Sequence, residues 1–110
     1  MPDSTITISH VMSFLAENSI PNLPSEALAE VFDSLIWCLS DNGEGILNVR
    51  KDWLSCDDLL KVKIALAMKE VFPYKTKEEM TIHFNKIIQK WPELKSICNK
   101  IVSEWDRQFF

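Results

Sequence analysis

The sequence predicts an all-α fold, a compact single-domain bundle of five to six short helices over residues 1–110. Apolar residues recur at helical spacing in segments that prolines separate. The chain has only two glycines, and both lie in the segment SDNGEGILNVRKDW, residues 40–53. No segment shows the sustained alternation of apolar and polar residues that a half-buried strand needs, so helices are favoured along the chain.

The first two helices are predicted from their apolar stripes. Residues 8–18 place Val11, Phe14 and Leu15 at i, i+3 and i+4, which is the spacing of one helix face. A second helix is expected over residues 24–40, because its first residue is a proline, which suits a first helical turn. The predicted core face of this second helix comprises Leu28, Val31, Phe32, Leu35 and Leu39.

The glycine-containing segment is predicted to end the second helix. Asn42 followed by Gly43 favours the left-handed backbone that commonly caps a helix C-terminus. After this pair, residues 46–54 place their apolar side chains on one short helix face. The run is too short to separate a helix from a strand, and both remain open.

A longer helix is predicted near residues 56–72. Ser55 is a candidate N-cap with Asp58 at the third helical position, in the manner of a capping box, and Pro73 is expected to end the helix. The apolar residues of this segment lie on two faces, and a helix that is apolar on two sides is usually buried between others. We therefore expect it to be the central helix of the bundle.

Two further helices are predicted in the remaining sequence. Thr76 and Glu79 form a Thr-x-x-Glu capping box, which is a strong start signal for a helix over residues 77–90. Pro92 is expected to open the last helix, in which apolar residues again repeat at helical spacing. The sequence thus contains a start signal for each of these helices.

Charge is distributed unevenly along the chain. Residues 1–49 contain seven acidic residues and no Lys or Arg, which gives a net charge of −7. Residues 50–110 contain nine acidic and twelve basic residues, which gives a net charge of +3. This asymmetry predicts a bipolar field that steers a charged partner, unless folding brings the two signs together.

The second helix has an acidic face. Glu26, Glu30 and Asp33 recur at i, i+4 and i+7 opposite the predicted core face. Trp37 falls in the same arc, where it is either covered by another part of the chain or exposed as an anchor for a partner. The sequence leaves both alternatives open. The predicted partner-binding residues are Glu26, Glu30, Asp33, Trp37, Asp41 and Glu44.

No arrangement of residues indicates catalysis or metal binding. Cys38, Cys56 and Cys98 are far apart and odd in number, which argues against a disulfide framework or a zinc site. DNGEG lacks the spacing of a calcium loop, and no Gly-Lys-Ser/Thr motif follows it. We expect no enzyme, no catalytic residue, no cofactor and no metal.

These patterns predict a small acidic cytoplasmic protein-binding module. Size and charge suggest, by analogy, an immunity or antitoxin-type protein that neutralises a basic toxin, such as a nuclease, by stoichiometric occlusion. The N-terminal sequence resembles no signal peptide, no membrane-spanning segment is predicted, and free thiols favour the cytoplasm. A homodimer through the same surface is left open.

The alternative function is a helix-turn-helix nucleic-acid-binding regulator that uses the helix over residues 77–90. Its outward residues are of types that contact bases and phosphates. An isoelectric point near 5.1 and the acidic first half argue against nucleic acid as the partner. The predicted outward residues of this helix are Asn85, Lys86, Gln89 and Lys90.

Overall fold

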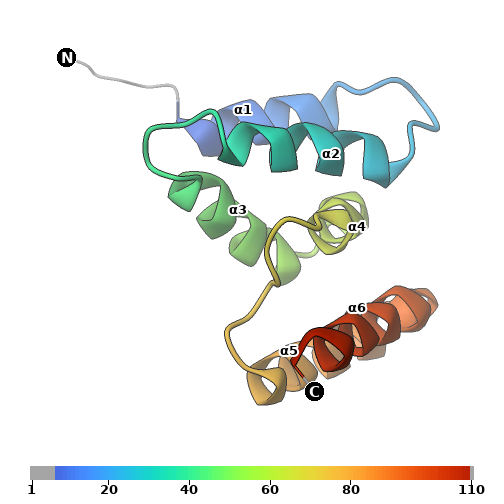
Figure 1. Ribbon diagram of the computed structural model, residues 1–110. Helices are drawn as coiled ribbons and strands as arrows, with labels where there is room; N and C mark the ends of the chain where they lie inside the picture. Colours follow the sequence, from blue (N-terminus) through green and yellow to red (C-terminus); the bar gives the residue numbers. More distant parts are fainter. Residues whose placement is uncertain (1–6, 110) are drawn as a thin grey trace. The chain divides into compact units, whose positions relative to one another are not determined.

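The computed structural model describes residues 7–109, which form six α-helices and one short 3₁₀ turn, with no strand among them (Figure 1). The all-α prediction of five to six short helices is therefore confirmed. The elements are α1 (Ile8–Glu17), α2 (Ser25–Ile36), α3 (Glu44–Leu54), α4 (Leu59–Ala67), α5 (Lys77–Lys90), η1 (Pro92–Leu94) and α6 (Lys95–Phe109).

The chain divides into two compact units, Met1–Lys69 and Glu70–Phe110. The first unit contains α1 to α4, and the second contains α5, η1 and α6. That all 110 residues form one domain stays a prediction. In the described part of the chain, no helix combines the length and apolar character needed to cross a membrane.

Helix α1 begins with an unexpected cap. The Thr7 side chain accepts a hydrogen bond from the His10 backbone N–H, and the His10 ring accepts one from the Thr7 N–H at 3.3 Å. The buried residues of α1 are Met12 and Ala16, whereas Phe14 of the predicted stripe is 62% exposed. Apolar residues cover more than half of this helix, so the contacts with α2 and α3 decide which of them are buried.

Helix α2 is shorter than predicted and its buried face is rotated. Phe32 is fully buried as expected, but Val31 of the predicted core face is 45% exposed. The buried stripe includes Ala29 and Ile36 instead. Contacts with α3 and α4 select this stripe, and an alanine allows the helices to approach closely.

The segment after α2 is a turn that leads into another helix. Helix α2 ends at Ile36 and not near residue 40, so Asn42 and Gly43 are not its cap. Both residues nevertheless have the left-handed backbone that their sequence predicts, with φ of 60° and 81°. Residues 46–54, left open between helix and strand, belong to α3.

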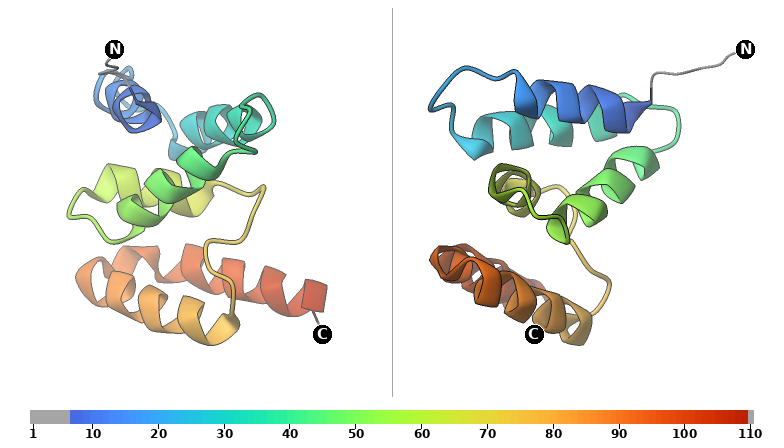
Figure 2. Two further views of the ribbon diagram at one scale, coloured as in Figure 1. Left: turned by 90° about the vertical axis from the view of Figure 1, so that its left-hand side faces the viewer. Right: turned by 180° about the vertical axis from the view of Figure 1, so that it is seen from behind.

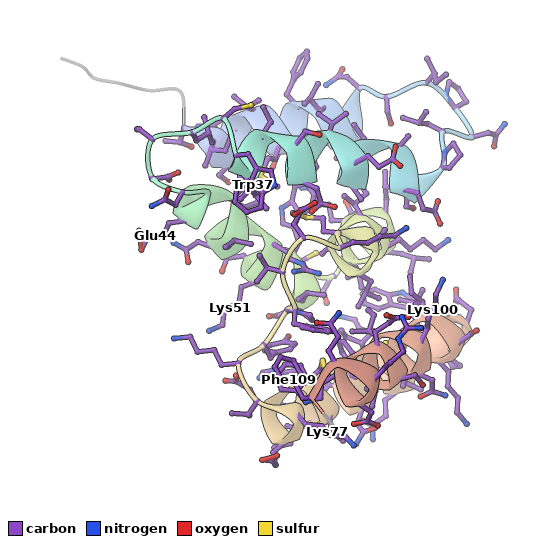
Figure 3. All side chains as sticks on the ribbon, viewed as in Figure 1. Trp37, Glu44, Lys51, Lys77, Lys100 and Phe109 are labelled. Carbon is purple, nitrogen blue, oxygen red and sulfur yellow. The ribbon has the colours of Figure 1, made fainter. Side chains whose placement is uncertain are left out.

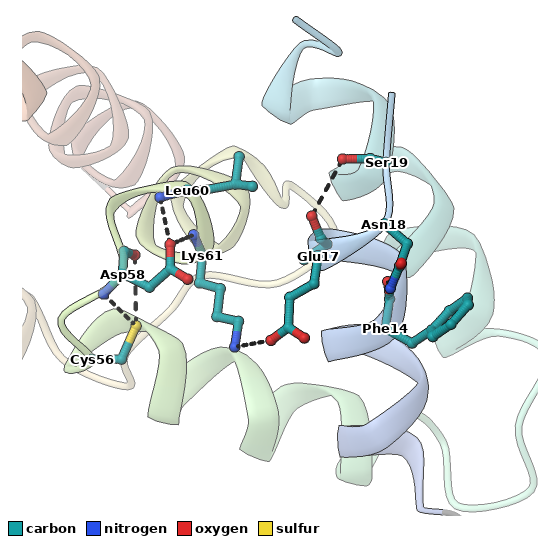
Figure 4. A network of polar contacts seen from close by, with 9 residues as sticks. Phe14, Glu17, Asn18, Ser19, Cys56, Asp58, Leu60 and Lys61 are labelled. Carbon is teal, nitrogen blue, oxygen red and sulfur yellow. Dashed lines mark hydrogen bonds and ion pairs between the residues drawn. The ribbon is translucent and has the colours of Figure 1, made fainter. Parts of the chain in front are cut away.

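Helix α4 begins later and ends earlier than predicted. Asp58 caps it instead of Ser55, because the Asp58 carboxylate accepts the N–H groups of Leu60 and Lys61 (Figure 4). The helix ends at Ala67, several residues before Phe72. As predicted from its two apolar faces, α4 is buried on both sides, and within the first unit it packs against α2 and α3 (Figures 1 and 2).

Side chains from other helices explain why α4 stops early. The Arg50 guanidinium on α3 donates to the Ala65 carbonyl at 2.9 Å and to the Met68 carbonyl at 2.7 Å. The Asp33 carboxylate on α2 accepts the Lys69 N–H at 2.9 Å. These side chains bind backbone groups at the end of α4, so the chain can leave the helix without burying unsatisfied polar groups.

The second unit is an antiparallel pair of helices joined by η1 (Figure 2). Helix α5 has the predicted bounds, and Thr76 accepts the Glu79 N–H at 3.1 Å. The Glu79 carboxylate accepts the N–H of Lys75 and not that of Thr76, so the box is incomplete. Pro92 opens a 3₁₀ turn, and α6 follows directly at Lys95.

Candidate protein-binding surface

Trp37 lies at the C-terminal end of α2 and is 73% exposed (Figure 3). The sequence left open whether Trp37 is covered or exposed, and the structure shows that it is exposed. Trp53, by contrast, is only 5% exposed and packs edge-on against Phe32 in the core of the first unit. An indole with this much surface in water contributes little to the core, and most of the Trp37 side chain can still be buried by a partner.

Two of the predicted carboxylates share an edge of α2 with Trp37. Positions 26, 30 and 37 differ by four and seven residues, so they project within about 40° of one another on an α-helix. Glu26 and Glu30 are exposed along this edge. The helix thus presents two carboxylates and one indole in a row.

Asp33 does not belong to this surface, which corrects the sequence-based prediction. It is 9% exposed, and its carboxylate accepts the Lys69 N–H. Glu26 and Asp33 are seven residues apart and project within about 20° of each other. Glu26 lies in the first turn of α2, where it is exposed, whereas the end of α4 covers Asp33 near the other end of the helix.

Asp41 and Glu44 extend the negative charge into the start of α3, and both are exposed. The Asp41 carboxylate accepts the N–H groups of Gly43 and Gly45, each at 2.9 Å. These two bonds, that from Gly45 first, hold the pKa of Asp41 below its ordinary value. Asp41 therefore holds the first turn of α3 as well as contributing charge to the surface.

We call the exposed residues Glu26, Glu30, Trp37, Asp41 and Glu44 the acidic surface. Among residues 7–109, none forms an ion pair with Glu26, Glu30 or Glu44. In the same unit, Glu17 by contrast forms an ion pair, because Lys61 lies 3.2 Å from its carboxylate (Figure 4).

The first basic residue of the chain does not neutralise the acidic surface. Arg50 is 3% exposed, and its guanidinium donates to the carbonyls at the end of α4. Lys51 is exposed, but it lies about two helical turns beyond Glu44 on α3 (Figure 3). The carboxylates of the acidic surface are therefore not paired with Arg50 or Lys51.

Both histidines and Cys56 have local structural contacts. His10 completes the cap of α1, and the His83 ring stacks on Tyr74 with centroids 4.6 Å apart. Cys56 accepts the Asp58 N–H at 3.4 Å beside the start of α4 (Figure 4). Burial raises the pKa of the Cys98 thiol to about 11, which keeps it protonated at neutral pH. Residues 7–109 contain no group of three or more His, Cys, Asp or Glu side chains placed to hold a metal ion.

The predicted helix-turn-helix outline differs from the structure at its turn. Nine residues, 68–76, connect α4 to α5, whereas the motif has a turn of about three to four residues. Lys86 and Lys90 are exposed on α5 as expected. The polar face of α5 exists, but the short turn before it does not.

Sequence reasoning assigned three exposed apolar residues to the core. Val11, Phe14 and Val31 are 38%, 62% and 45% exposed. The sequence does indicate that some apolar residues must be exposed, because they cover more of α1 and α2 than one core face requires. All three residues lie on α1 or α2.

Known proteins offer no guide to this surface. No family model matches the chain, and no similar curated protein or solved structure was found. Any functional assignment therefore depends on the geometry and charge of the chain itself.

Proposed function

We propose that this protein is a small acidic binding module whose partner is a basic protein. The observation that carries the proposal is the acidic surface, where an indole that is 73% exposed shares one helix edge with Glu26 and Glu30. Residues 1–49 contain no Lys or Arg that would weaken the negative potential from within this segment.

The two components of the surface supply different parts of binding. Tryptophan is enriched among the residues that dominate interface energetics, because a large rigid side chain loses much water-exposed area at little entropic cost. Carboxylates around it contribute mainly to the rate of association with a basic partner and to the choice of partner. Together they favour a specific complex over unspecific adhesion.

The finer proposal is that the module is an immunity or antitoxin-type protein that occludes a basic toxin. A nuclease presents Lys and Arg to the phosphates of its substrate, and exposed carboxylates can pair with the same groups. One module would then block one active site stoichiometrically. This finer proposal is an analogy of size and charge, and it makes the partner a cytoplasmic basic domain.

The test uses two double variants as baits in a lysate of the source cells. Glu26→Lys with Glu30→Lys reverses charge on the acidic surface, and Glu78→Lys with Glu93→Lys makes the same charge change in the second unit. Glu26 and Glu78 both lie in the first turn of an α-helix, so this part of the helix-dipole cost is matched. Asp33 is left unchanged because it is buried.

We expect a basic protein to be retained by the wild type and by the second-unit variant, but not by the α2 variant. Circular dichroism must show that all three baits are folded. Retention of the same proteins by all three baits would contradict the proposal. If the captured protein is a nuclease, one equivalent of the wild-type module should abolish its activity, and undiminished activity would rule out the occlusion mechanism.

A further inference from the structure

Exposed apolar side chains are concentrated in α1, α2 and the loop between them. Nine large apolar side chains are exposed among residues 7–109, and five of these lie between positions 11 and 37. Trp37 belongs to the acidic surface already described. The other four are Val11, Phe14, Ile20 and Val31.

Three of these side chains lie on the outer side of the α1–α2 pair. Phe14 is two residues from both buried residues of α1, Met12 and Ala16, so it projects about 160° to 200° away from them. Val31 projects mostly away from the buried stripe of α2 in the same manner. Helices α1 and α2 lie side by side and antiparallel, with α3 and α4 on the buried side of the pair (Figure 2).

We call Val11, Phe14 and Val31 the outer apolar surface. Its exposure is large for side chains of this kind, since Phe14 alone leaves 62% of its area in water. Exposed apolar side chains that gather on one side of two neighbouring helices mark an interaction site more often than scattered ones do. Two helices that lie side by side and expose apolar side chains are suited to receive the apolar face of a third helix.

Exposed carboxylates lie on the same two helices. Residues 7–37 contain no Lys or Arg. Of their four carboxylates, Asp33 is buried and Glu17 is paired with Lys61, which leaves Glu26 and Glu30 exposed and without an ion pair among residues 7–109. Glu30 is the residue next to Val31 in the sequence and is exposed. An occupant of the outer apolar surface therefore meets carboxylates at its margin.

This charge distribution selects among possible occupants. A second copy of the chain that binds by the same surface would bring carboxylates against carboxylates, which is unfavourable. An anionic membrane surface would also be repelled. A helix with apolar residues on one face and Lys or Arg along its flanks satisfies both the apolar surface and the carboxylates.

We propose that the outer apolar surface receives a basic amphipathic helix of the partner. The inference rests on the proposed function, since it specifies the form in which the basic partner is recognised. The apolar face of that helix packs on Val11, Phe14 and Val31, and its basic flank lies toward Glu30 and Glu26. The acidic surface around Trp37 then binds a neighbouring part of the same partner.

The probe is a fluorescein-labelled peptide of leucine and lysine, about 18 residues or five turns long, with leucine on one helix face. One control peptide has glutamate in place of lysine, and a second has the leucine–lysine composition in an order that spreads leucine over all faces. Fluorescence anisotropy measures binding of each peptide to the full chain.

The matched protein variants are Phe14→Ser with Val31→Ser, and Ile82→Ser with Phe109→Ser in the second unit. Each pair removes one exposed aromatic and one exposed aliphatic side chain, with exposed fractions of 62% and 45% in the first pair and 59% and 57% in the second. We expect the first pair to weaken binding of the leucine–lysine peptide about tenfold or more, and the second pair to leave it within about twofold.

Several results would overturn the inference. They are no binding of the leucine–lysine peptide by the wild type up to about 100 μM, equal binding of either control peptide, and equal affinity of the wild type and the Phe14/Val31 variant. A wild type that is dimeric and a Phe14/Val31 variant that is monomeric would assign the surface to a second copy.

The same titration separates this inference from the proposed function. If the Glu26/Glu30 variant loses affinity and the Phe14/Val31 variant does not, the amphipathic-helix inference fails while the acidic binding module stands. If the reverse holds, the outer apolar surface stands and the role of the α2 carboxylates fails. If neither variant changes the affinity, both fail.

Discussion

Charged side chains act differently at the junction of α2, α3 and α4 and along the exposed edge of α2. At the junction, Asp33 and Arg50 are buried and bind backbone groups at the end of α4. Along the edge, Glu26 and Glu30 are exposed, and no residue between 7 and 109 forms an ion pair with them. In the first region the charged groups are bound by the backbone, whereas along the edge they remain exposed to solvent, with only the position of Glu26 in the first turn of α2 favouring the helix.

Substitution of Arg50 at the junction should have the largest effect on stability. Arg50→Ala removes buried donors from the Ala65 and Met68 carbonyls and leaves a cavity, so we expect a loss of about 3–5 kcal/mol of unfolding free energy. Urea denaturation measures this loss. Lys51→Ala, the exposed neighbour, is the control and should change stability by less than about 0.5 kcal/mol. Equal effects of the two substitutions would show that burial at the junction does not matter.

A substitution in the turn between α2 and α3 should have the next largest effect on stability. Gly43 has φ of 81°, and a Cβ there would lie 2.6 Å from Cγ2 of Ile36. Gly43→Ala should cost about 2–4 kcal/mol, because a left-handed alanine is strained and the core side chain must move. Gly45→Ala is the comparison: its Cβ would lie 3.0 Å from Cγ2 of Ile8, but alanine favours the helix by about 1 kcal/mol. Urea denaturation should therefore show the larger loss for Gly43, and the opposite order would contradict the steric argument.

Substitution of Asp41 should have the smallest effect on stability. Asp41 is exposed on the acidic surface, and its carboxylate also accepts two backbone N–H groups. Its lowered pKa means that its contribution to stability is complete above the unfolded-state value of about 3.9 and disappears as pH falls through the folded-state value. Asp41→Asn should thus be less stable than the wild type at neutral pH. The difference in urea midpoint should be smaller at about pH 3 than at pH 7, because part of the contribution is lost below the unfolded-state pKa. A difference that is the same at both pH values would contradict the assignment.

Local signals predicted the elements whose ends are decided locally. Thr76 and Glu79 located α5 to the residue, because the capping bond joins neighbours in the sequence. The left-handed backbone of Asn42 and Gly43 was predicted for the same reason. Each of these features depends on a few consecutive residues, and sequence patterns report such features well.

The end of α4 and the buried face of α2 could not be predicted, because contacts between residues far apart in the sequence decide them. The end of α4 is fixed by Arg50 and Asp33, which come from two other helices. Asp33 shares its helical direction with Glu26, so periodicity alone placed both on one acidic face. The exposure of Val31 likewise follows from which stripe of α2 packs on its neighbours. Of the six predicted partner-binding residues, only Asp33 is buried, because the end of α4 covers it. That the other five bind a partner stays a prediction.

The most direct test of the central claim is the association rate of the captured basic partner as a function of salt. Stopped-flow fluorescence would compare the wild type with the Glu26/Glu30 and Glu78/Glu93 lysine variants. If the edge of α2 steers the partner, the Glu26/Glu30 variant will associate more slowly and with a flatter salt dependence, and the Glu78/Glu93 variant will follow the wild type. Identical rates and salt slopes for the wild type and the Glu26/Glu30 variant would contradict the claim that this edge meets the partner.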